Sequence, residues 1–253
     1  MSRGLKGLSA SAVSEHISRY SSAIERKAST SKSGLVELDA WYQSLPFSTV
    51  SSPCSGLDSK ESLLKLVRWK LGREKHRPTL LSLVSSNPPD LVNKTLRKAA
   101  TYLVERKLTL DSDDDDLLSR VVGAMEILIT LRGVGPATAS AICAAWNPAG
   151  IFQSDHLVEL LDNRTKVKYT LPFYKAFYKN AIRTVKDTHG MDSGKSLDRL
   201  AFSLAHPDPS PSHLQDKQDK PDRHDKKEEK QQPPKRSVSP PAPATRPKRT
   251  RRQ

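Results

Sequence analysis

The sequence has little cysteine. Its 253 residues include two cysteines, Cys54 and Cys143, which lie far apart. Two cysteines are too few for a disulfide framework or for a four-cysteine zinc site. Residues 1–6 lack the apolar run of a signal peptide, and no stretch approaches the roughly 18 apolar residues of a membrane span. We therefore expect a soluble protein of a reducing, intracellular compartment, with no membrane partner.

Apolar residues are scarce as well. They make up 36% of the chain, whereas roughly 45–50%, counting glycine, is usual in globular proteins. The composition changes at Pro207, and residues 207–253 hold ten of the 18 prolines among charged residues and very few large apolar ones. Such a segment buries too little surface to offset the entropy lost on ordering. We expect a disordered tail over 207–253, a folded domain over 35–206 and a flexible or helical leader over 1–33.

Positive charge, by contrast, is abundant. The formal net charge is +14, and the tail holds 13 basic and seven acidic residues, a net charge of +6. Basic chains attract polyanions, because neutralising phosphate dominates non-specific binding to nucleic acids. An acidic membrane surface is the alternative, but no basic amphipathic helix with bulky aromatic residues stands out. DNA is therefore the expected partner.

The end of the tail is the most basic part of the chain. Lys248, Arg249, Arg251 and Arg252 are typical of a nuclear-import signal, or of a tail that holds DNA. The sequence therefore predicts a nuclear protein, expected to be monomeric, whose tail would also be the place for protein partners.

The remainder of the chain shows helical periodicity and no strand-like alternation. Apolar residues and capping signals predict helices over about 10–27, 35–45, 59–71, 79–86, 91–104, 117–131, 156–161, 171–187 and 196–206, with a further helix that begins at Pro136. The predicted fold class is all-α.

One very short turn joins two of these helices. Gly133 and Gly135 bracket Val134, and Pro136 suits the first position of the helix that follows. A Gly-x-Gly turn leaves backbone N–H groups pointing outward at a helix N-terminus, which is a favourable place for an anion. In a basic chain the expected anion is a nucleic-acid phosphate.

Residues 131–139, Leu-Arg-Gly-Val-Gly-Pro-Ala-Thr-Ala, resemble the helix-hairpin-helix DNA-binding motif. The spacing onward to Asp155 resembles that of base-excision DNA glycosylases of the helix-hairpin-helix superfamily. The resemblance implies a helical glycosylase-like domain and a catalytic carboxylate at Asp155. It also implies phosphate contacts from Arg132, Gly133, Val134, Gly135 and Thr138. It allows a monovalent cation at the hairpin, and we expect no other cofactor and no metal site.

The sequence departs from this family in two ways. Ala137 occupies the position of the Schiff-base lysine of bifunctional members, so the resemblance implies a monofunctional enzyme at most. The arginine that follows the catalytic acid in many members is absent after His156. Residues 69–78 also resemble an uncharacterised eukaryotic group with a similar hairpin, a likeness that implies no activity.

Several alternatives stay open at this point. Asp155 is either catalytic or, with Ser154, part of a helix N-cap. Arg73, Lys75 and Arg77 form either auxiliary DNA contacts or an ordinary solvated loop. The predicted function is a DNA-binding protein that resembles monofunctional glycosylases. The alternative is a non-catalytic module that binds DNA or a protein.

Overall fold

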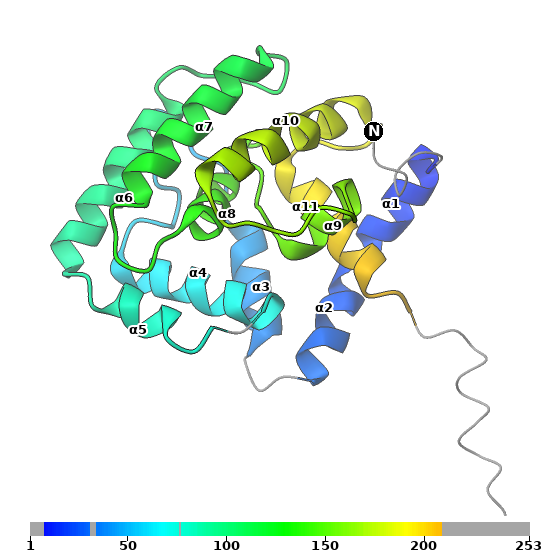
Figure 1. Cartoon of the computed structure of the whole chain (residues 1–253), viewed down its shortest axis with the longest axis horizontal. Coiled ribbons are helices and arrows are strands. Elements are labelled where there is room, and N and C mark those ends of the chain that lie inside the picture. The colour runs from blue at the N-terminus through cyan, green and yellow to red at the C-terminus, as the bar shows by residue number, and fades with distance from the viewer. Residues whose placement is uncertain (1–7, 31–33, 76, 209–253) are drawn as a thin grey trace, which may run out of the picture. The chain divides into compact units, whose positions relative to one another are not determined.

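The structure, a computed structural model, describes residues 8–30, 34–75 and 77–208 (Figure 1). In these residues it contains eleven α-helices and no strand, which confirms the all-α class. The helices are α1 (Ala10–Ser18), α2 (Tyr20–Ser29), α3 (Leu35–Ser44), α4 (Lys60–Arg73), α5 (Leu80–Ser85), α6 (Pro89–Val104), α7 (Asp114–Leu128), α8 (Pro136–Trp146), α9 (Asp155–Leu161), α10 (Leu171–Asp187) and α11 (Gly194–Ala205). The predicted nuclear-import residues Lys248, Arg249, Arg251 and Arg252 lie outside the described residues, as does the rest of the predicted tail beyond Asp208.

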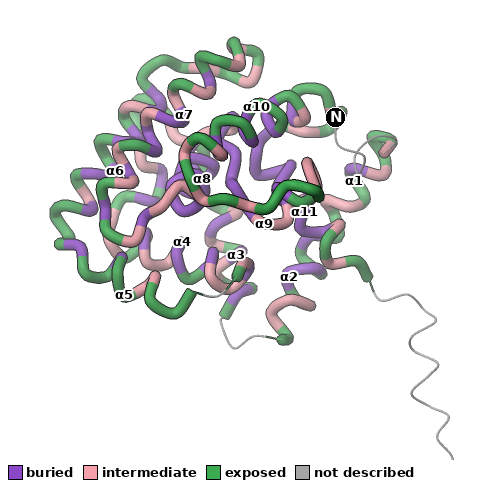
Figure 2. The backbone as a smooth tube through the Cα atoms, viewed as in Figure 1, coloured by how far each residue is buried: buried purple, intermediate pink, exposed green. Residues whose placement is uncertain are grey.

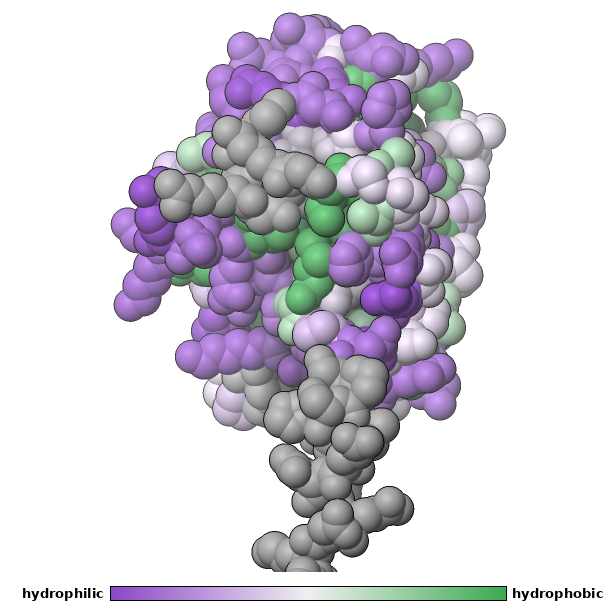
Figure 3. Space-filling view, turned by 90° about the vertical axis from the view of Figure 1, so that its right-hand side faces the viewer, coloured by the Kyte–Doolittle hydropathy of each residue, from purple (hydrophilic) through white to green (hydrophobic). Residues whose placement is uncertain are grey.

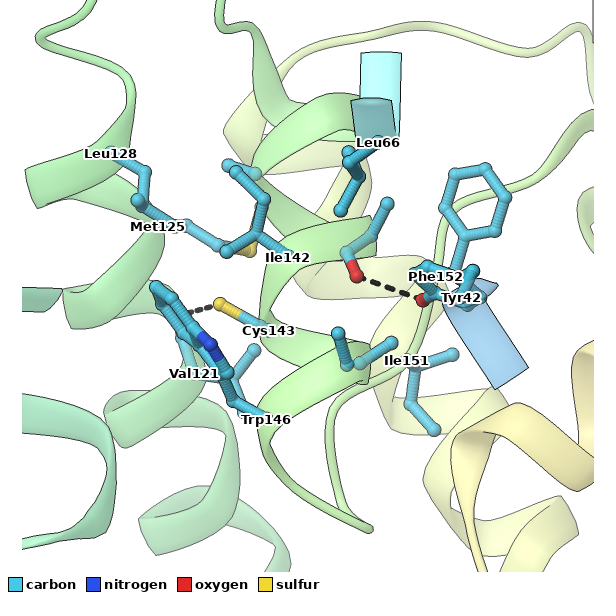
Figure 4. Close-up of a cluster of buried hydrophobic side chains, with 14 of the residues drawn as sticks. Tyr42, Leu66, Val121, Met125, Leu128, Ile142, Cys143, Trp146, Ile151 and Phe152 are labelled. Atoms are coloured by element: carbon cyan, nitrogen blue, oxygen red, sulfur yellow. Dashed lines mark hydrogen bonds between the residues drawn. The ribbon is translucent and has the colours of Figure 1, made fainter. Parts of the chain in front are cut away.

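Helix α8 lies at the centre of the domain, where all its residues from Ala137 to Trp146 are buried (Figure 2). Small side chains along α8 let neighbouring helices approach closely. Its larger residues Cys143 and Trp146 pack among apolar side chains of several helices, including Val121 and Met125 of α7 (Figure 4). Burial of these apolar side chains is the main favourable contribution to folding.

Hydrogen bonds tie other elements to this central helix. The Tyr42 hydroxyl of α3 donates to the carbonyl oxygen of Ala141 at 2.9 Å, as Figure 4 shows. The Trp146 Nε1–H donates to the carbonyl oxygen of Cys54 at 2.9 Å. These bonds satisfy polar groups that burial would otherwise leave without partners.

Two glycines permit very close backbone approach beside α8. A Cβ atom on Gly150 would lie 2.3 Å from the Cys143 carbonyl oxygen, and one on Gly194 would lie 2.0 Å from the Gly150 carbonyl oxygen. Larger residues at these positions would therefore separate the backbones. The glycines keep the start of α11 and the segment after α8 against the core.

The first two helices are part of the folded unit. Both α1 and α2 pack against α11, and Tyr20, Ala23 and Ile24 of α2 are buried. The Tyr20 hydroxyl also donates to Asp39 Oδ1 at 2.6 Å. On this side of the molecule an apolar strip is flanked by hydrophilic side chains (Figure 3). The folded region therefore begins well before residue 35, where the sequence had placed its start.

A buried ion pair joins α4 to α11. Arg73 Nη1 donates to Asp198 Oδ2 at 2.7 Å, and both side chains are almost completely buried. The guanidinium carbon lies 4.9 Å from the ring centroid of Trp69 and 4.5 Å from that of Phe202. The prediction that Arg73 contacts DNA is therefore corrected: α4 continues through this residue and turns it into the core.

We expect Asp198→Asn to destabilise the fold strongly, because it leaves the Arg73 guanidinium buried without its carboxylate. Removing one partner of a buried pair costs about 3–5 kcal/mol. The free energy of unfolding, measured by urea titration, tests this expectation. Asp115→Asn is the matched control, since it removes the exposed Lys179–Asp115 pair of 2.8 Å, and exposed pairs contribute roughly 0–1 kcal/mol. Equal losses in the two variants would contradict the assigned role of Asp198.

Candidate functional site

The hairpin (residues 131–136) connects α7 to α8 and has a tightly specified backbone. Gly133 has a φ of +78°, a conformation that favours glycine. A Cβ atom on Gly133 would also lie 2.9 Å from Leu83 Cβ and 3.0 Å from the Val84 backbone nitrogen. Both its conformation and its close contact with α5 therefore require glycine at this position.

Asn87 holds the hairpin from the other side. Its side-chain Nδ2 donates to the carbonyl oxygens of Arg132 and Val84, each at 2.9 Å. Its Oδ1 accepts from the Arg132 backbone N–H at 2.9 Å. Asn87 is only 2% exposed, so these bonds are shielded from water. The sequence gives no sign of this role for Asn87, because an asparagine after a helix is common and its partner lies far along the chain.

The free donors of the hairpin gather at the start of α8. Among the described residues, the backbone N–H groups of Gly133, Gly135 and Ala137 have no acceptor. The Arg132 side chain is exposed, and no described atom lies within 4 Å of a Cβ atom built on Gly135. An anion therefore has access to unpaired donors at the positive end of the α8 dipole.

Two of the predicted phosphate-binding residues do not reach this surface. Thr138 is 3% exposed, and its N–H donates to the Gly135 carbonyl oxygen at 3.0 Å. The Val134 side chain is buried, and its N–H donates to the Leu131 carbonyl oxygen at 3.1 Å. These two residues stabilise the turn, which corrects their predicted contact with phosphate.

Asp155 is not the residue that caps α9. Ser154 is the N-cap of α9, where its Oγ accepts from the Leu157 N–H at 3.2 Å. The Asp155 carboxylate is partly exposed and accepts a hydrogen bond from the Tyr169 hydroxyl at 2.6 Å. The Asp155 N–H donates to Glu74 Oε2 at 2.9 Å. Asp155 therefore keeps a carboxylate oxygen available for other partners.

A group of ionisable residues, which we call the Asp155 cluster, surrounds this carboxylate. It consists of Lys70, Glu74, Arg77, Asp155 and Tyr169. Burial raises the pKa of Glu74 to about 7, although Arg73 and the N–H of Asp155 act in the opposite direction. Burial and the bond to Asp155 raise the pKa of Tyr169 to about 12. The Arg77 guanidinium carbon lies 4.8 Å from the Tyr169 ring centroid, so Arg77 belongs to this cluster.

The chain that leads to Asp155 passes beside α8. After α8 the chain runs back along it, and the Gln153 N–H donates to Ser140 Oγ at 3.0 Å. Ser140 is about 6 Å along the helix from Pro136, at 1.5 Å per residue. Residues 74–87 also border both sites, through Glu74 at the Asp155 cluster and Asn87 at the hairpin.

Exposed basic side chains lie in the segments next to the Asp155 cluster. Lys75 and Arg77 are exposed, as predicted contacts should be, unlike Arg73. The connection between α9 and α10 is basic as well, and Gln153 Nε2 donates to the Lys168 carbonyl oxygen at 2.8 Å, which places Lys168 beside the chain leading into α9. This connection crosses the face of the domain in Figure 1.

Comparison with protein-family models, curated proteins and solved structures finds no match. No helix in the described part of the chain has the length and apolar character needed to cross a membrane. Within residues 8–30, 34–75 and 77–208, no three His, Cys, Asp or Glu side chains are grouped so that they could hold a metal ion. The assignment of function therefore depends on the chemistry of the hairpin and the Asp155 cluster.

Glu74 should make stability depend on pH. Its folded-state pKa of about 7 exceeds the ordinary value of 4.5, so the folded chain binds the proton more tightly than the unfolded chain does. The stabilisation is present below about pH 4.5 and is lost as pH rises through about 7. We expect a loss of roughly 1–3 kcal/mol over this window, and Glu74→Gln should remove it.

Urea titrations at several pH values between 4 and 8 test this expectation as the difference between wild type and Glu74→Gln. Burial lowers the pKa of His156 to about 4, and its contribution has the opposite sign, but it cancels in that difference. Glu61→Gln, at an exposed residue of α4, is the matched control. A pH dependence that is identical in wild type and Glu74→Gln would contradict the raised pKa.

Proposed function

We propose that the chain binds duplex DNA and that the hairpin grips a backbone phosphate. The observation that carries this proposal is the set of unpaired N–H groups of Gly133, Gly135 and Ala137 beside the exposed Arg132. Backbone donors at a helix N-terminus bind phosphate oxygens without sequence preference. The hydrogen bonds from Asn87 hold these donors in place before the ligand arrives, which lowers the entropic cost of binding.

The charge of the chain supports the same proposal. Lys75, Arg77, Arg132, Lys166 and Lys168 are exposed basic residues of the hairpin and of the segments beside the Asp155 cluster. Basic side chains near a phosphate site speed association and strengthen binding at low salt. The acidic residues Asp113–Asp116 lie at the opposite end of the preceding helix, α7, so the length of α7 separates them from the hairpin.

Gly135→Val should weaken duplex binding about tenfold or more, because two or three blocked charge-assisted bonds of this kind are worth several kcal/mol. Gly135 has a φ of −98° and open space around its Cβ position, so the valine fits the fold while it covers the donors. Arg132→Gln should reduce the slope of log K against log salt by about 0.9, the value for one lost phosphate contact. Fluorescence anisotropy of a labelled duplex measures both effects.

Arg183→Gln is the matched charge control, because Arg183 is exposed on α10 and does not belong to the hairpin. It should lower the affinity only slightly. Thermal melting checks that each variant is folded. Affinity that is unchanged in both hairpin variants would exclude the phosphate grip and would favour a protein partner for this surface.

Base excision is a second candidate function, and the Asp155 carboxylate is the observation that favours it. Asp155 is partly exposed, is not used as the N-cap, and follows Gln153, which bonds to Ser140 of α8. A carboxylate beside a DNA-binding surface can stabilise the oxocarbenium-like sugar that forms when an N-glycosidic bond breaks, once the base is flipped from the stack.

Asp155→Asn should therefore abolish base release from a panel of damaged duplexes and leave the affinity for DNA within about twofold, since a phosphate grip does not use this group. Gel analysis of strand cleavage after alkali treatment measures base release. Asp162→Asn, at the other end of α9, is the control and should retain activity. Wild-type protein that binds DNA but releases no base would favour the non-catalytic module.

A further inference from the structure

A small pocket lies between the end of α9 and α10. Its volume is about 120 Å³, well below the roughly 300–1,000 Å³ of pockets that hold drug-sized ligands, so it suits a single side chain. Its lining is mostly apolar and includes Val158, Phe173 and Phe177. None of its lining residues belongs to the hairpin or to the Asp155 cluster. The proposed binding of DNA therefore does not account for this pocket.

Phe173 brings an aromatic ring to the pocket. Its side chain is partly buried and packs against the core from the first turns of α10. Among the residues that the structure describes, no second ring contacts it and no cation lies over it. The face of an aromatic ring attracts a cation, most often a guanidinium group. Phe173 is therefore available to a cationic ligand in the pocket.

Asp162 adds a carboxylate to the same pocket. Its side chain is 45% exposed. Its Oδ2 accepts from the Thr165 hydroxyl, and its Oδ1 accepts from the Arg164 N–H at 3.1 Å. These two bonds, that from Thr165 first, lower the pKa of Asp162, so the group is a carboxylate at neutral pH. Each carboxylate oxygen accepts more than one hydrogen bond, so Asp162 is held in place and can still bind a donor.

The groups around Asp162 favour a ligand that is positively charged. Asn180 also lines the pocket, and its side chain forms no hydrogen bond with another described residue. Glu159 is exposed three residues before Asp162 and has no ion pair within the described residues. The nearest cation is Arg164, whose Nε lies 3.9 Å from Asp162 Oδ1. Its side chain is 92% exposed and does not line the pocket, so the chain's own arginine leaves the pocket open.

We propose that this pocket binds an arginine side chain of a partner protein. The guanidinium group donates two parallel hydrogen bonds to the Asp162 carboxylate and stacks on the ring of Phe173, while its methylene groups contact the apolar lining. Arginine suits the pocket better than lysine, because its planar fork pairs bidentately with a carboxylate, stacks on a ring and is more weakly hydrated. The recognition uses complementary charge in a pocket of single-side-chain size, and it does not depend on DNA binding.

A short peptide tests the proposal without DNA. The isotope-labelled full chain is titrated with acetyl-Gly-Arg-Gly-amide and followed by two-dimensional NMR. The backbone amides of Asp162, Thr165 and Asn180 should shift with a Kd below about 1 mM. The citrulline peptide, which has the same shape without the charge, should bind about tenfold more weakly or worse, because it loses the charge-assisted pair. The lysine peptide should also bind more weakly. Equal binding of the citrulline or lysine peptide, or no shift at these amides, would overturn the proposal.

Four variants separate this pocket from general attraction between charges. Ala176→Leu should abolish binding of the arginine peptide, because Ala176 is exposed on the pocket wall and leucine fills the space while it suits a helix. Asp162→Asn should weaken binding about tenfold or more. Arg164→Gln should strengthen it about twofold, because a competing cation is removed. Asp111→Asn, at an exposed residue outside the pocket, is the matched control and should change little.

Thermal melting checks that each variant is folded, and Ala176→Leu keeps the test informative if Asp162→Asn disturbs the end of α9. Unchanged binding in Ala176→Leu would overturn the proposal, as would weaker binding in Arg164→Gln. Shifts at the pocket that depend on protein concentration before any peptide is added would mean that a second copy of the chain occupies it, and would also contradict the proposal. These outcomes are independent of the DNA-binding experiments.

Discussion

The burial of one short helix made largely of small residues is the constraint on which the rest of the structure depends. Because α8 is buried from Ala137 to Trp146, both segments that enter and leave it must be placed against other helices. At its start the hairpin packs closely against α5, and only a glycine fits at position 133. At its end Gly150 and Gly194 bring the chain back along the helix. The chain that leads to Asp155 thereby passes beside Ser140 of the same helix.

The second constraint is the buried position of Arg73 at the end of α4. Arg73 is held inside by Asp198 of α11 and by the surrounding aromatic rings. Fixing Arg73 also fixes the next residue, Glu74, whose carboxylate accepts the N–H of Asp155 at the start of α9. The buried ion pair and the Asp155 cluster therefore meet at the end of α4, where Arg73 and Glu74 are adjacent.

The parts of this arrangement that the sequence predicts are those encoded locally. Helical periodicity gives the all-α class, and the Gly-x-Gly turn before Pro136 gives the hairpin. Local patterns do not reveal which partner a side chain meets across the fold. Arg73 has the sequence surroundings of a solvated basic loop, yet its partner Asp198 lies in the last helix. For the same reason the sequence does not predict the partners of Asn87 and Glu74. The apolar stripe of α2 likewise does not show that another helix covers it.

The segment that follows α4 links the two places, because Glu74 belongs to the Asp155 cluster and Asn87 contacts the hairpin. Glu74 accepts from the Asp155 backbone, and Asn87 binds both backbone groups of Arg132. A shift of this segment would therefore alter both places together, since packed elements of this kind move as units. A phosphate seated on the hairpin would stabilise the segment through Asn87 and α5. If the proposed phosphate binding holds, the same ligand would thereby favour the geometry in which Glu74 accepts the Asp155 N–H, although it would touch neither residue.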